Sequence, residues 1–368
     1  MHIGVVVPTL RGGGAQFAAV QWLRGLDALG HKATVYLTGD LQLPVEVPDR
    51  IVIRRCARRY KARLPLWLRW QVRQDRPDVI LSLLTYTNVV SILALRCGRS
   101  RVPVAVSERT LASLAEARPR DRLVLSFARL LYRRASAAIA ISHPVAAELI
   151  SLFHVDPRRV FVVPNPVTDG PREQNKLGPS DSAQLHIVNV GRHEVDKDPG
   201  LFLKVVQALS EKGIDVRGTL VGDGTLRVVL EEQARAAALP VSFLGWRDAW
   251  WKAARGADCL VLTSRVEGFG NVLIEAAAVG IPAVASSRAI GVADAIVPGI
   301  TGELVLTDDA EAFADGVLRA VGNGDLRGAA IGAWLDHFSV ERSTELLVRA
   351  LREAVGYELC PIRRSTAC

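Results

Sequence analysis

The twenty residues from Cys259 to Ala278, CLVLTSRVEGFGNVLIEAAA, decide the fold of this chain. The apolar run Cys259–Leu262 predicts a buried strand, and Thr263–Gly268 after it predicts a turn. From Asn271 the alanine-rich spacing becomes helical, and Asn271 is placed to cap that helix. A strand, a glycine-containing turn and a helix N-terminus together offer backbone N–H groups and a positive dipole end to an anion. The stretch therefore predicts an α/β fold with a phosphate-binding turn.

Two carboxylates flank this predicted anion site. Glu267 lies in the turn, and Glu275 lies about one turn inside the helix, roughly 6 Å along its axis. A carboxylate accepts hydrogen bonds from both hydroxyls of a diol, so Glu275 is suited to a ribose behind the phosphate. The alternative interpretation is structural, with Glu267 a solvated turn residue and Glu275 an exposed helix position.

Length and composition define the broad class of protein. The 368 residues suffice for two α/β domains, and a hydrophobic content of 49% is typical of a soluble, well-packed protein. No uninterrupted apolar run reaches the roughly 18 residues that span a bilayer. Residues Met1–Pro8 predict a strand rather than a secretory signal. The five scattered cysteines argue against a disulfide framework or a metal site and favour a cytoplasmic protein.

The net charge of +8 is unevenly distributed along the chain. Residues 1–170 contain 25 Lys and Arg against 12 Asp and Glu, a net +13, whereas the remainder has 21 against 26, a net −5. No zinc-finger spacing or aromatic RNA-binding motif accompanies the basic half, so nucleic acid is not an expected partner. An anionic membrane surface or a phosphate-bearing acceptor suits this charge better.

The densest basic segment is residues 54–76, RRCARRYKARLPLWLRWQVRQDR. Pro65 suits the first turn of a helix, and three apolar residues at helical spacing should face the core: Leu64, Leu68 and Val72. One interpretation is a helix with a solvated basic face. The other is an interfacial element with Trp67 and Trp70 at the level of lipid headgroups. That second interpretation assigns lipid contact to three arginines: Arg58, Arg59 and Arg63.

Polar residues at predicted strand ends mark candidate sites in the first half. A glycine loop follows the first strand and precedes a helix at Phe17–Leu29, and it lacks the Gly-x-Gly-x-x-Gly spacing of a dinucleotide fold. Asn88 follows the strand Asp78–Leu84, and Glu108 and Arg109 follow the strand Val102–Val106. Strand ends of this kind line the cleft in open α/β sheets.

In the second half, the strand Leu185–Val190 leads into a turn with Arg192 and Lys197, a pair suited to a diphosphate. Asp196 and Asp198 have the spacing of a metal-binding Asp-x-Asp, which is an alternative interpretation of the same turn. Trp246 ends a later strand, where it would either pack or, as the family resemblance described below implies, stack on the nucleotide base. Polar residues at Thr168–Ser182 predict a linker between two domains.

The stretch EGFGNVLIEAAAVGIPAVAS, residues 267–286, resembles the retaining glycosyltransferases of family 4, whose signature is two glutamates separated by seven residues, here Glu267 and Glu275. The resemblance covers nearly the whole chain and is more specific in the second half. It implies the GT-B fold, two doubly wound Rossmann-like α/β domains facing across a cleft. The expected divisions are an acceptor-binding domain at 1–168, a nucleotide-sugar-binding domain at 169–340, and, at 341–368, a helix that packs back on the first domain plus a loose tail.

The resemblance also implies roles for individual residues. Arg192 and Lys197 match a Gly-Arg-x4-Lys element that clamps the leaving diphosphate, Glu267 orients the donor sugar, and Glu275 binds the ribose. Further donor contacts are expected at Gly12, Gly13, Gly14, Phe269, Gly270, Asn271 and Val272. Many relatives have a histidine near the second strand end, where this chain has Glu108 and Arg109. These two residues and Asn88 are candidates for the acceptor, and a local Glu108–Arg109 ion pair is the alternative.

The activity that the resemblance implies is a retaining, metal-independent transfer without a resident cofactor. A hexose or N-acetylhexosamine would move from a nucleotide-diphosphate sugar, with UDP favoured, to a hydroxyl of a glycan or polyprenyl-diphosphate-linked acceptor. The expected setting is bacterial surface polysaccharide assembly, in the cytoplasm and peripheral on the inner face of its membrane. Two alternatives stay open: a sugar-nucleotide epimerase of the same fold, and a non-catalytic protein that binds polyanions or membranes.

Overall fold

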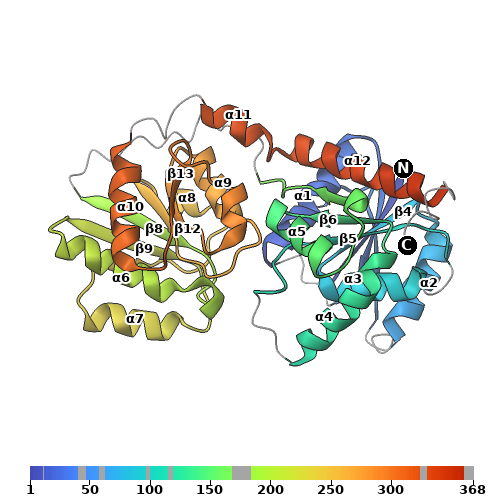
Figure 1. The fold of residues 1–368 in the computed structure, drawn as a ribbon, viewed down its shortest axis with the longest axis horizontal. Coiled ribbons are helices and arrows are strands. Elements are labelled where there is room, and N and C mark those ends of the chain that lie inside the picture. Colours follow the sequence, from blue (N-terminus) through green and yellow to red (C-terminus); the bar gives the residue numbers. More distant parts are fainter. Residues whose placement is uncertain are drawn as a thin grey trace. The chain divides into compact units, whose positions relative to one another are not determined.

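A computed structural model describes residues 1–10, 12–39, 47–57, 63–96, 100–114, 119–167, 184–323 and 330–359. The chain divides into two compact units, whose elements Figure 1 shows. Unit 1 comprises Met1–Pro166 and Ser339–Cys368, and unit 2 comprises Val167–Phe338. The predicted linker, Arg58, Arg59 and the tail from Pro361 lie outside the described residues.

Unit 1 is built on a parallel sheet with strand order β3-β2-β1-β4-β5-β6-β7 among its described residues. Most of its strands are buried runs of Val, Ile, Leu and Ala, as expected for a parallel sheet covered on both faces. The strands are β1 (His2–Val7), β2 (Lys32–Leu37), β3 (Val52–Arg55), β4 (Val79–Leu83), β5 (Val104–Glu108), β6 (Ala137–Ala140) and β7 (Val160–Val162).

The helices of unit 1 are α1 (Gly14–Ala28), α2 (Leu64–Asp75), α3 (Thr85–Ser91), α4 (Pro119–Leu131), α5 (His143–Ser151) and α12 (Val340–Leu359). Shorter helical turns are η2 (Ile92–Arg96), η3 (Tyr132–Arg134) and η4 (Pro157–Arg159). In α2 the predictions for Pro65 and for the three core-facing residues are confirmed. The interfacial position predicted for Trp67 is wrong: its side chain is only 7% exposed, whereas Trp70 is 57% exposed.

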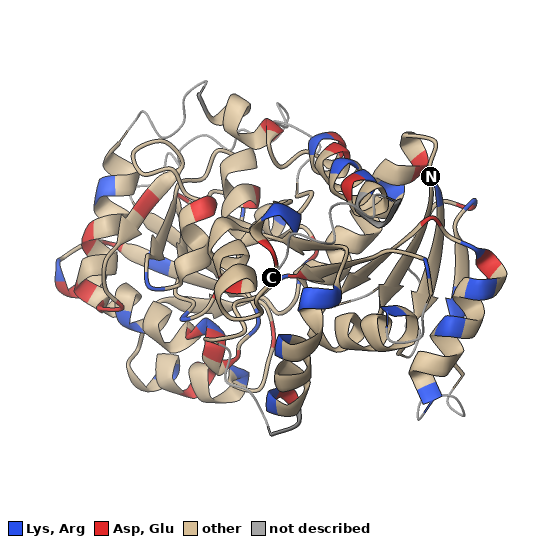
Figure 2. Ribbon diagram, turned by 45° about the vertical axis from the view of Figure 1, so that its right-hand side comes forward, with Lys and Arg blue, Asp and Glu red and all other residues tan. Residues whose placement is uncertain are grey.

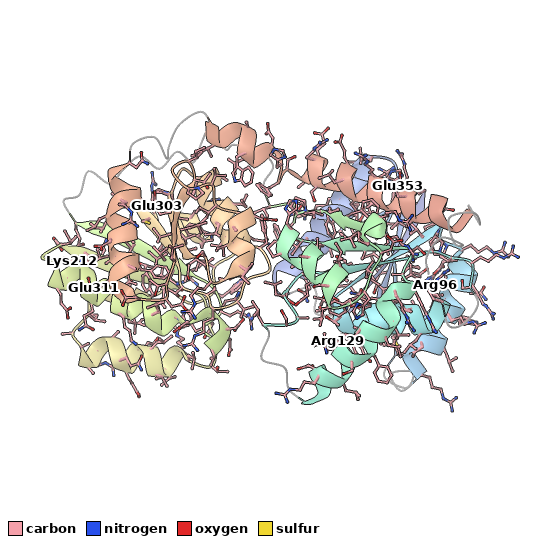
Figure 3. All side chains as sticks on the ribbon, viewed as in Figure 1. Arg96, Arg129, Lys212, Glu303, Glu311 and Glu353 are labelled. Atoms are coloured by element: carbon pink, nitrogen blue, oxygen red, sulfur yellow. The ribbon has the colours of Figure 1, made fainter. Side chains whose placement is uncertain are left out.

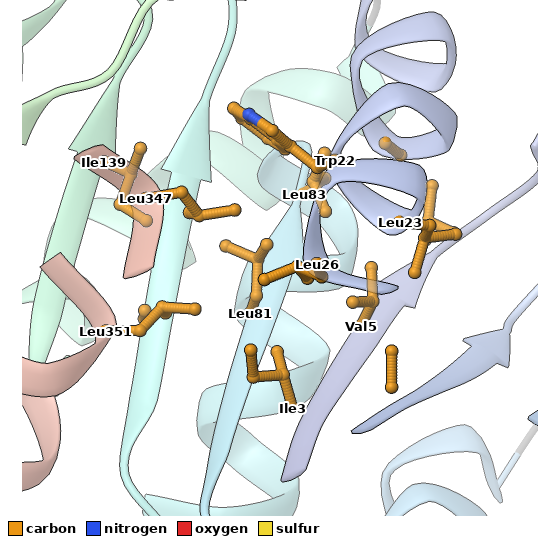
Figure 4. Close-up of a cluster of buried hydrophobic side chains, with 14 of the residues drawn as sticks. Ile3, Val5, Trp22, Leu23, Leu26, Leu81, Leu83, Ile139, Leu347 and Leu351 are labelled. Atoms are coloured by element: carbon orange, nitrogen blue, oxygen red, sulfur yellow. The ribbon is translucent and has the colours of Figure 1, made fainter. Parts of the chain in front are cut away.

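The core of unit 1 contains residues from both ends of its sequence. Leu347 and Leu351 of α12 lie with Leu81 of β4 and Ile139 of β6 in one buried cluster (Figure 4). The helix α12 also packs against α1. Two distant segments of the chain therefore close the same core.

Trp22 of α1 is bonded, through Ser343, to the two segments by which the chain leaves unit 1 and returns to it. Its indole Nε1–H donates to Ser343 Oγ at 2.9 Å, and that hydroxyl donates to the carbonyl of Pro164 at 2.6 Å. The Arg109 guanidinium lies 4.4 Å from the centre of the same indole. One buried tryptophan thus connects the outgoing segment at Pro164 with the returning helix at Ser343.

Unit 2 repeats the architecture with strand order β10-β9-β8-β11-β12-β13 among its described residues, again all parallel. The predicted strands at Leu185–Val190 and Cys259–Leu262 are confirmed as β8 and β11. The other strands are β9 (Val216–Val221), β10 (Val241–Phe243), β12 (Ala283–Ser286) and β13 (Gly302–Val305). The helices are α6 (Pro199–Glu211), α7 (Arg227–Ala236), α8 (Trp250–Ala253), α9 (Asn271–Ala278), α10 (Ala310–Gly322) and α11 (Ala330–Asp336), with helical turns η6 (Val195–Lys197) and η7 (Ile290–Asp294).

The two sheets share a side-chain device at the amino ends of their central strands. In unit 1 the backbone N–H of His2 donates to Asp78 Oδ2, and the His2 ring bonds to Thr34 Oγ1. In unit 2 His186 makes the same two contacts, to Asp258 and to Thr219. In each sheet these hydrogen bonds link the amino end of the first strand to both neighbouring strands.

The close approach of α1 and α12 gives a stability prediction. A Cβ at Gly25 would lie 2.9 Å from Thr344 Cβ, so Gly25→Ala should push α12 outward and lower the free energy of unfolding by roughly 1–3 kcal/mol. Chemical denaturation measures the change. The control is Gly356→Ala in α12, where nothing lies within 4 Å and the better helix former should be neutral or stabilising. Equal stabilities for the two variants would contradict this packing.

Candidate active site

The two predicted loops of unit 2 follow neighbouring strands where the strand order reverses. β8 lies between β9 and β11, and the chain leaves β8 at Gly191 and β11 at Thr263. Ligands in open α/β sheets bind at the carboxyl ends of strands at this switch point. Backbone and side-chain bonds join the loops: Arg265 N–H donates to Asp196 O at 3.0 Å, and Thr263 Oγ1 donates to Lys197 O at 3.2 Å.

Lys197 and Glu267 meet in this joined pair of loops. Lys197 Nζ lies 2.7 Å from Glu267 Oε1, and the side chains are 20% and 13% exposed. Ser264 Oγ donates to the same carboxylate oxygen at 2.8 Å. The structure therefore brings together two of the three residues predicted to be catalytic, with Glu267 held by a cation and a hydroxyl.

Arg192, the third predicted catalytic residue, lies closer to solvent in the same loop. Its Nη2 pairs with Asp196 Oδ2 at 3.1 Å, and Arg265 Nε pairs with Asp198 Oδ2 at 2.8 Å. The two aspartates of the Asp-x-Asp alternative thus contact arginines. Within the described ranges no three His, Cys, Asp or Glu side chains gather as metal ligands.

The helix after the Glu267 turn begins at Asn271, the residue that was predicted to be its cap. Gly270 precedes α9 with a φ of 91°, and Asn271 is the first helical residue, so the prediction of Asn271 as the cap is wrong. A left-handed residue at this point favours glycine, because any Cβ at Gly270 would also lie 2.9 Å from Leu273 Cδ1. Phe269 is buried against Phe338, with ring centres 5.3 Å apart, so its side chain anchors the turn while Val272 continues the helix.

Glu275 lies in the second turn of α9 and is half-buried. It accepts a hydrogen bond from the indole Nε1–H of Trp250 at 2.8 Å. Trp246, for which packing was one of the two interpretations, is 55% exposed, and its Nε1–H donates to Asp248. The packing interpretation of Trp246 is therefore wrong.

Sequence reasoning missed several residues that support these loops. A Cβ at Gly291 would lie 2.5 Å from Gly268 O, so the η7 backbone packs directly on the Glu267 turn. His193 is fully buried beside Gly222, Gly224 and Phe243. Among the described residues neither nitrogen of its ring has a hydrogen-bond partner, and burial lowers the pKa of the imidazole. Gly222, Gly224 and Gly291 can be seen in the sequence, but the residues that they pack against belong to other loops, so the sequence does not show these contacts.

In unit 1 the predicted glycine loop is partly helical. Gly14 begins α1, three residues before the predicted start, and Gly12 has a φ of 128°. Gly13 precedes the helix without a side-chain cap. Gly12 to Gly14 lie after β1, next to β4, at the switch point of the first sheet.

Asn88 and Glu108 belong to a buried hydrogen-bond cluster in unit 1. Glu108 accepts from Thr85 Oγ1 at 3.1 Å, from Asn88 Nδ2 at 3.1 Å and from the Tyr132 hydroxyl. Asn88 and Tyr132 are fully buried and Glu108 is almost so. Burial raises the pKa of Glu108 to about 7, although the three hydrogen bonds oppose the shift.

Arg109 points into a different buried environment. Its Nη1 donates to Val163 O at 3.2 Å and to Asn165 Oδ1 at 3.1 Å, while its plane lies over Trp22. Burial lowers its pKa to about 9. The alternative of a Glu108–Arg109 ion pair is wrong, because consecutive residues at a strand end face opposite sides and each side chain has other partners. Acceptor contact by these residues stays a prediction.

The fold and the paired loops define a protein of two Rossmann-like domains with a charged site at the switch point of the second. A family model described as Glycosyltransferase Family 4 matches residues 12–169, and one described as Glycosyl transferases group 1 matches residues 184–323. A D-inositol 3-phosphate glycosyltransferase of Actinosynnema mirum is 31% identical over 283 residues, 69% of this chain and 67% of that relative. The chain therefore belongs to the family 4, group 1 glycosyltransferases.

Two further comparisons extend over most of the chain. A Campylobacter jejuni relative, named GalNAc-alpha-(1->4)-GalNAc-alpha-(1->3)-diNAcBac-PP-undecaprenol alpha-1,4-N-acetyl-D-galactosaminyltransferase, is 27% identical and covers 85% of this chain and 87% of its own. The crystal structure of Anabaena HepE with UDP and glucose matches with a TM-score of 0.73 at 19% identity, over 95% of this chain and 99% of HepE. Such neighbours show the GT-B fold. Several curated relatives are matched over about half of their own length.

The buried cluster gives a pH prediction. The pKa of Glu108 is about 7 in the folded protein against 4.5 for an unperturbed carboxyl, so the folded state binds more protons between these values. Its contribution to the free energy of unfolding should therefore fall as the pH rises from about 4.5 to 7, by up to about 1.4 kcal/mol per pH unit.

Glu108→Gln should remove that slope and become more stable relative to wild type as the pH rises through this window, as followed by denaturant unfolding. The matched control is Glu353→Gln, an exposed carboxylate on α12 of the same unit (Figure 3). A constant stability difference between wild type and Glu108→Gln across the window would contradict the raised pKa.

Proposed function

We propose that this chain is a retaining, metal-independent glycosyltransferase without a resident cofactor. It moves a hexose or N-acetylhexosamine from a UDP-sugar to a hydroxyl of a glycan or polyprenyl-diphosphate-linked acceptor in bacterial surface glycan assembly. The main observation in support of this proposal is the Lys197–Glu267 pair at the switch point of unit 2. The UDP complex of HepE and the undecaprenol-linked acceptor in the name of the C. jejuni relative support the choice of substrates.

The leaving diphosphate is the group that these loops are suited to hold. Lys197 and Arg192 supply two cations from the β8 loop, and the amides at Gly270, Asn271 and Val272 stand at the start of α9. Negative charge grows on the diphosphate in the transition state, so preorganised cations and helix N–H groups lower the barrier. These groups supply the neutralisation that a divalent ion provides in other transferases.

Glu267 is placed to orient the donor sugar. Ser264 and Lys197 hold its carboxylate, and the Gly291 backbone supports its turn. Attack by the acceptor hydroxyl on the face from which the diphosphate leaves retains the anomeric configuration and requires no protein nucleophile. The departing diphosphate then accepts the hydroxyl proton. Glu275, one helical turn further, binds the ribose.

We assign acceptor binding to unit 1. Asn88 and Glu108, which were predicted to contact the acceptor, are buried and would act by supporting the residues above them. Asn88 and Glu108 are buried with Tyr132, so they position the start of α3 and the end of β5. Thr85 is the first residue of α3 and bonds to Glu108. We therefore assign these residues the task of shaping the acceptor surface.

Helix α4 is the proposed contact with the membrane that carries a lipid-linked acceptor. Leu123, Phe127 and Leu130 are 60%, 46% and 54% exposed and recur at helical spacing. Arg122 and Arg129 of the same helix and Arg133 after it are exposed as well, and Figure 3 labels Arg129. Lys and Arg also recur on the helices beside the N-terminus (Figure 2). Apolar side chains bordered by arginines suit an anionic lipid surface.

The exposed face of α4 takes the place of Trp67 as the proposed lipid contact, since Trp67 in residues 54–76 is buried. Among the described helices none is both long and apolar enough to cross a bilayer. From the exposed apolar and basic face of α4, we propose that the enzyme binds at the inner face of the cytoplasmic membrane from the cytoplasm.

The clamp is tested by Lys197→Ala and Arg192→Ala. Each should lower turnover roughly 100-fold or more, because each removes charge stabilisation of the leaving group. Sugar transfer from UDP-hexoses and UDP-N-acetylhexosamines to a polyprenyl-diphosphate-linked glycan is measured, with melting temperatures recorded for each variant. Lys204→Ala, an exposed lysine on α6 of the same unit, is the control and should retain wild-type turnover.

Two further arms of that assay separate the alternatives. An altered UDP-sugar released without acceptor would identify an epimerase. Activity that disappears with a chelator and returns with magnesium or manganese would contradict metal independence. Wild-type turnover in either clamp variant would contradict the assignment of diphosphate binding to this loop.

The membrane contact is tested by co-sedimentation with vesicles of phosphatidylglycerol and phosphatidylcholine. Wild type should bind these vesicles, bind less in high salt, and bind little to phosphatidylcholine alone. Replacing Leu123, Phe127 and Leu130 with serine should weaken binding at least tenfold, because three exposed apolar side chains that would enter the lipid surface are lost. Serine at Val228 and Val229, exposed on α7 of unit 2, is the control. Equal binding by all variants, or to neutral vesicles, would exclude α4 as this surface.

A further inference from the structure

Each of the two glutamates of the site accepts a hydrogen bond from a side chain on another element. Glu267 pairs with the cation of Lys197, whereas Glu275 accepts from the neutral indole N–H of Trp250. Trp250 is 2% exposed and begins α8, 25 positions before Glu275 in the chain. The neighbouring Trp251 ring lies edge-on at 6.0 Å, which restricts rotation of the indole.

A neutral donor orients a carboxylate without cancelling its charge. A lysine or arginine at this point would bring its own positive charge and compete with a ligand for the carboxylate oxygens. An indole has a single N–H and no acceptor, so it holds one carboxylate oxygen by a directional bond and adds no positive charge of its own. A carboxylate held in a fixed orientation can accept hydrogen bonds from both hydroxyls of a ribose.

We infer that Trp250 is a positioning residue that fixes the Glu275 carboxylate for the two ribose hydroxyls of the donor nucleotide. The inference rests on the proposed function, which assigns the ribose to Glu275. It adds a specificity element: the Trp250–Glu275 pair makes the site prefer ribonucleotides to nucleotides that lack the hydroxyls. A burial requirement alone would be met by any large apolar side chain at position 250.

Trp250→Phe tests the inference because phenylalanine keeps an aromatic ring and loses only the N–H donor. Isothermal titration measures the Kd of UDP and of 2′,3′-dideoxy-UDP for each variant. Trp250→Phe should weaken UDP binding roughly tenfold to a hundredfold, the range of one hydrogen bond to a charged group, and change dideoxy-UDP binding less than about twofold. In turnover assays KM for the donor should rise more than kcat falls. Trp251→Phe is the matched control and should leave the UDP to dideoxy-UDP ratio unchanged.

Glu275→Gln separates failure of this inference from failure of the proposed function. If Glu275→Gln leaves the ratio at its wild-type value, the ribose assignment itself is wrong. If Glu275→Gln lowers the ratio but Trp250→Phe behaves like Trp251→Phe, or weakens both ligands equally, the positioning role is overturned. A Trp250→Phe/Glu275→Gln double variant should lose no more preference for UDP than Glu275→Gln alone, because the tryptophan acts through the glutamate.

Discussion

All described strands within each sheet run parallel, and this constraint places every loop of functional interest at one edge. The strand order reverses beside β1 in unit 1 and beside β8 in unit 2, so the loops after those strands diverge from the loops of their neighbours. In unit 2 the separation brings Arg192, Lys197 and Glu267 into one site. The opposite edges are tied by the His2–Asp78 and His186–Asp258 bonds. The carboxyl edge is thus where side chains can be arranged for chemistry.

Sequence patterns predicted the strand β11 and the helix α9 well, because the information that specifies them is local. The apolar run Cys259–Leu262, the glycine turn and the alanine-rich helix lie in one stretch, and each obeys a short-range rule. The cap was misplaced by one residue because the positive φ of Gly270, and not the side chain of Asn271, starts the helix. The pairing of Lys197 with Glu267 joins positions 70 apart, so no local sequence pattern predicted it.

The remaining misassignments have tertiary causes. Trp67 is buried because α2 packs against α3 and η2, contacts that the sequence of α2 does not reveal. Glu108 pairs in register with Ala140, which places it within the sheet and not in a loop, and Tyr132 then encloses it. Trp250 offered no sequence signal, since a large apolar residue before a strand is ordinary and its carboxylate partner belongs to another helix.

The return of α12 to unit 1 determines the order in which the chain can fold during its synthesis. Unit 2 is made of contiguous residues, Val167–Phe338, and emerges from the ribosome complete. Unit 1 lacks Leu347, Leu351 and Ser343 until α12 has been made, and with them the partner of Trp22 and part of its core. The first-made domain therefore waits with an open apolar face while the second is translated, which reverses the usual N-terminal-first order of folding.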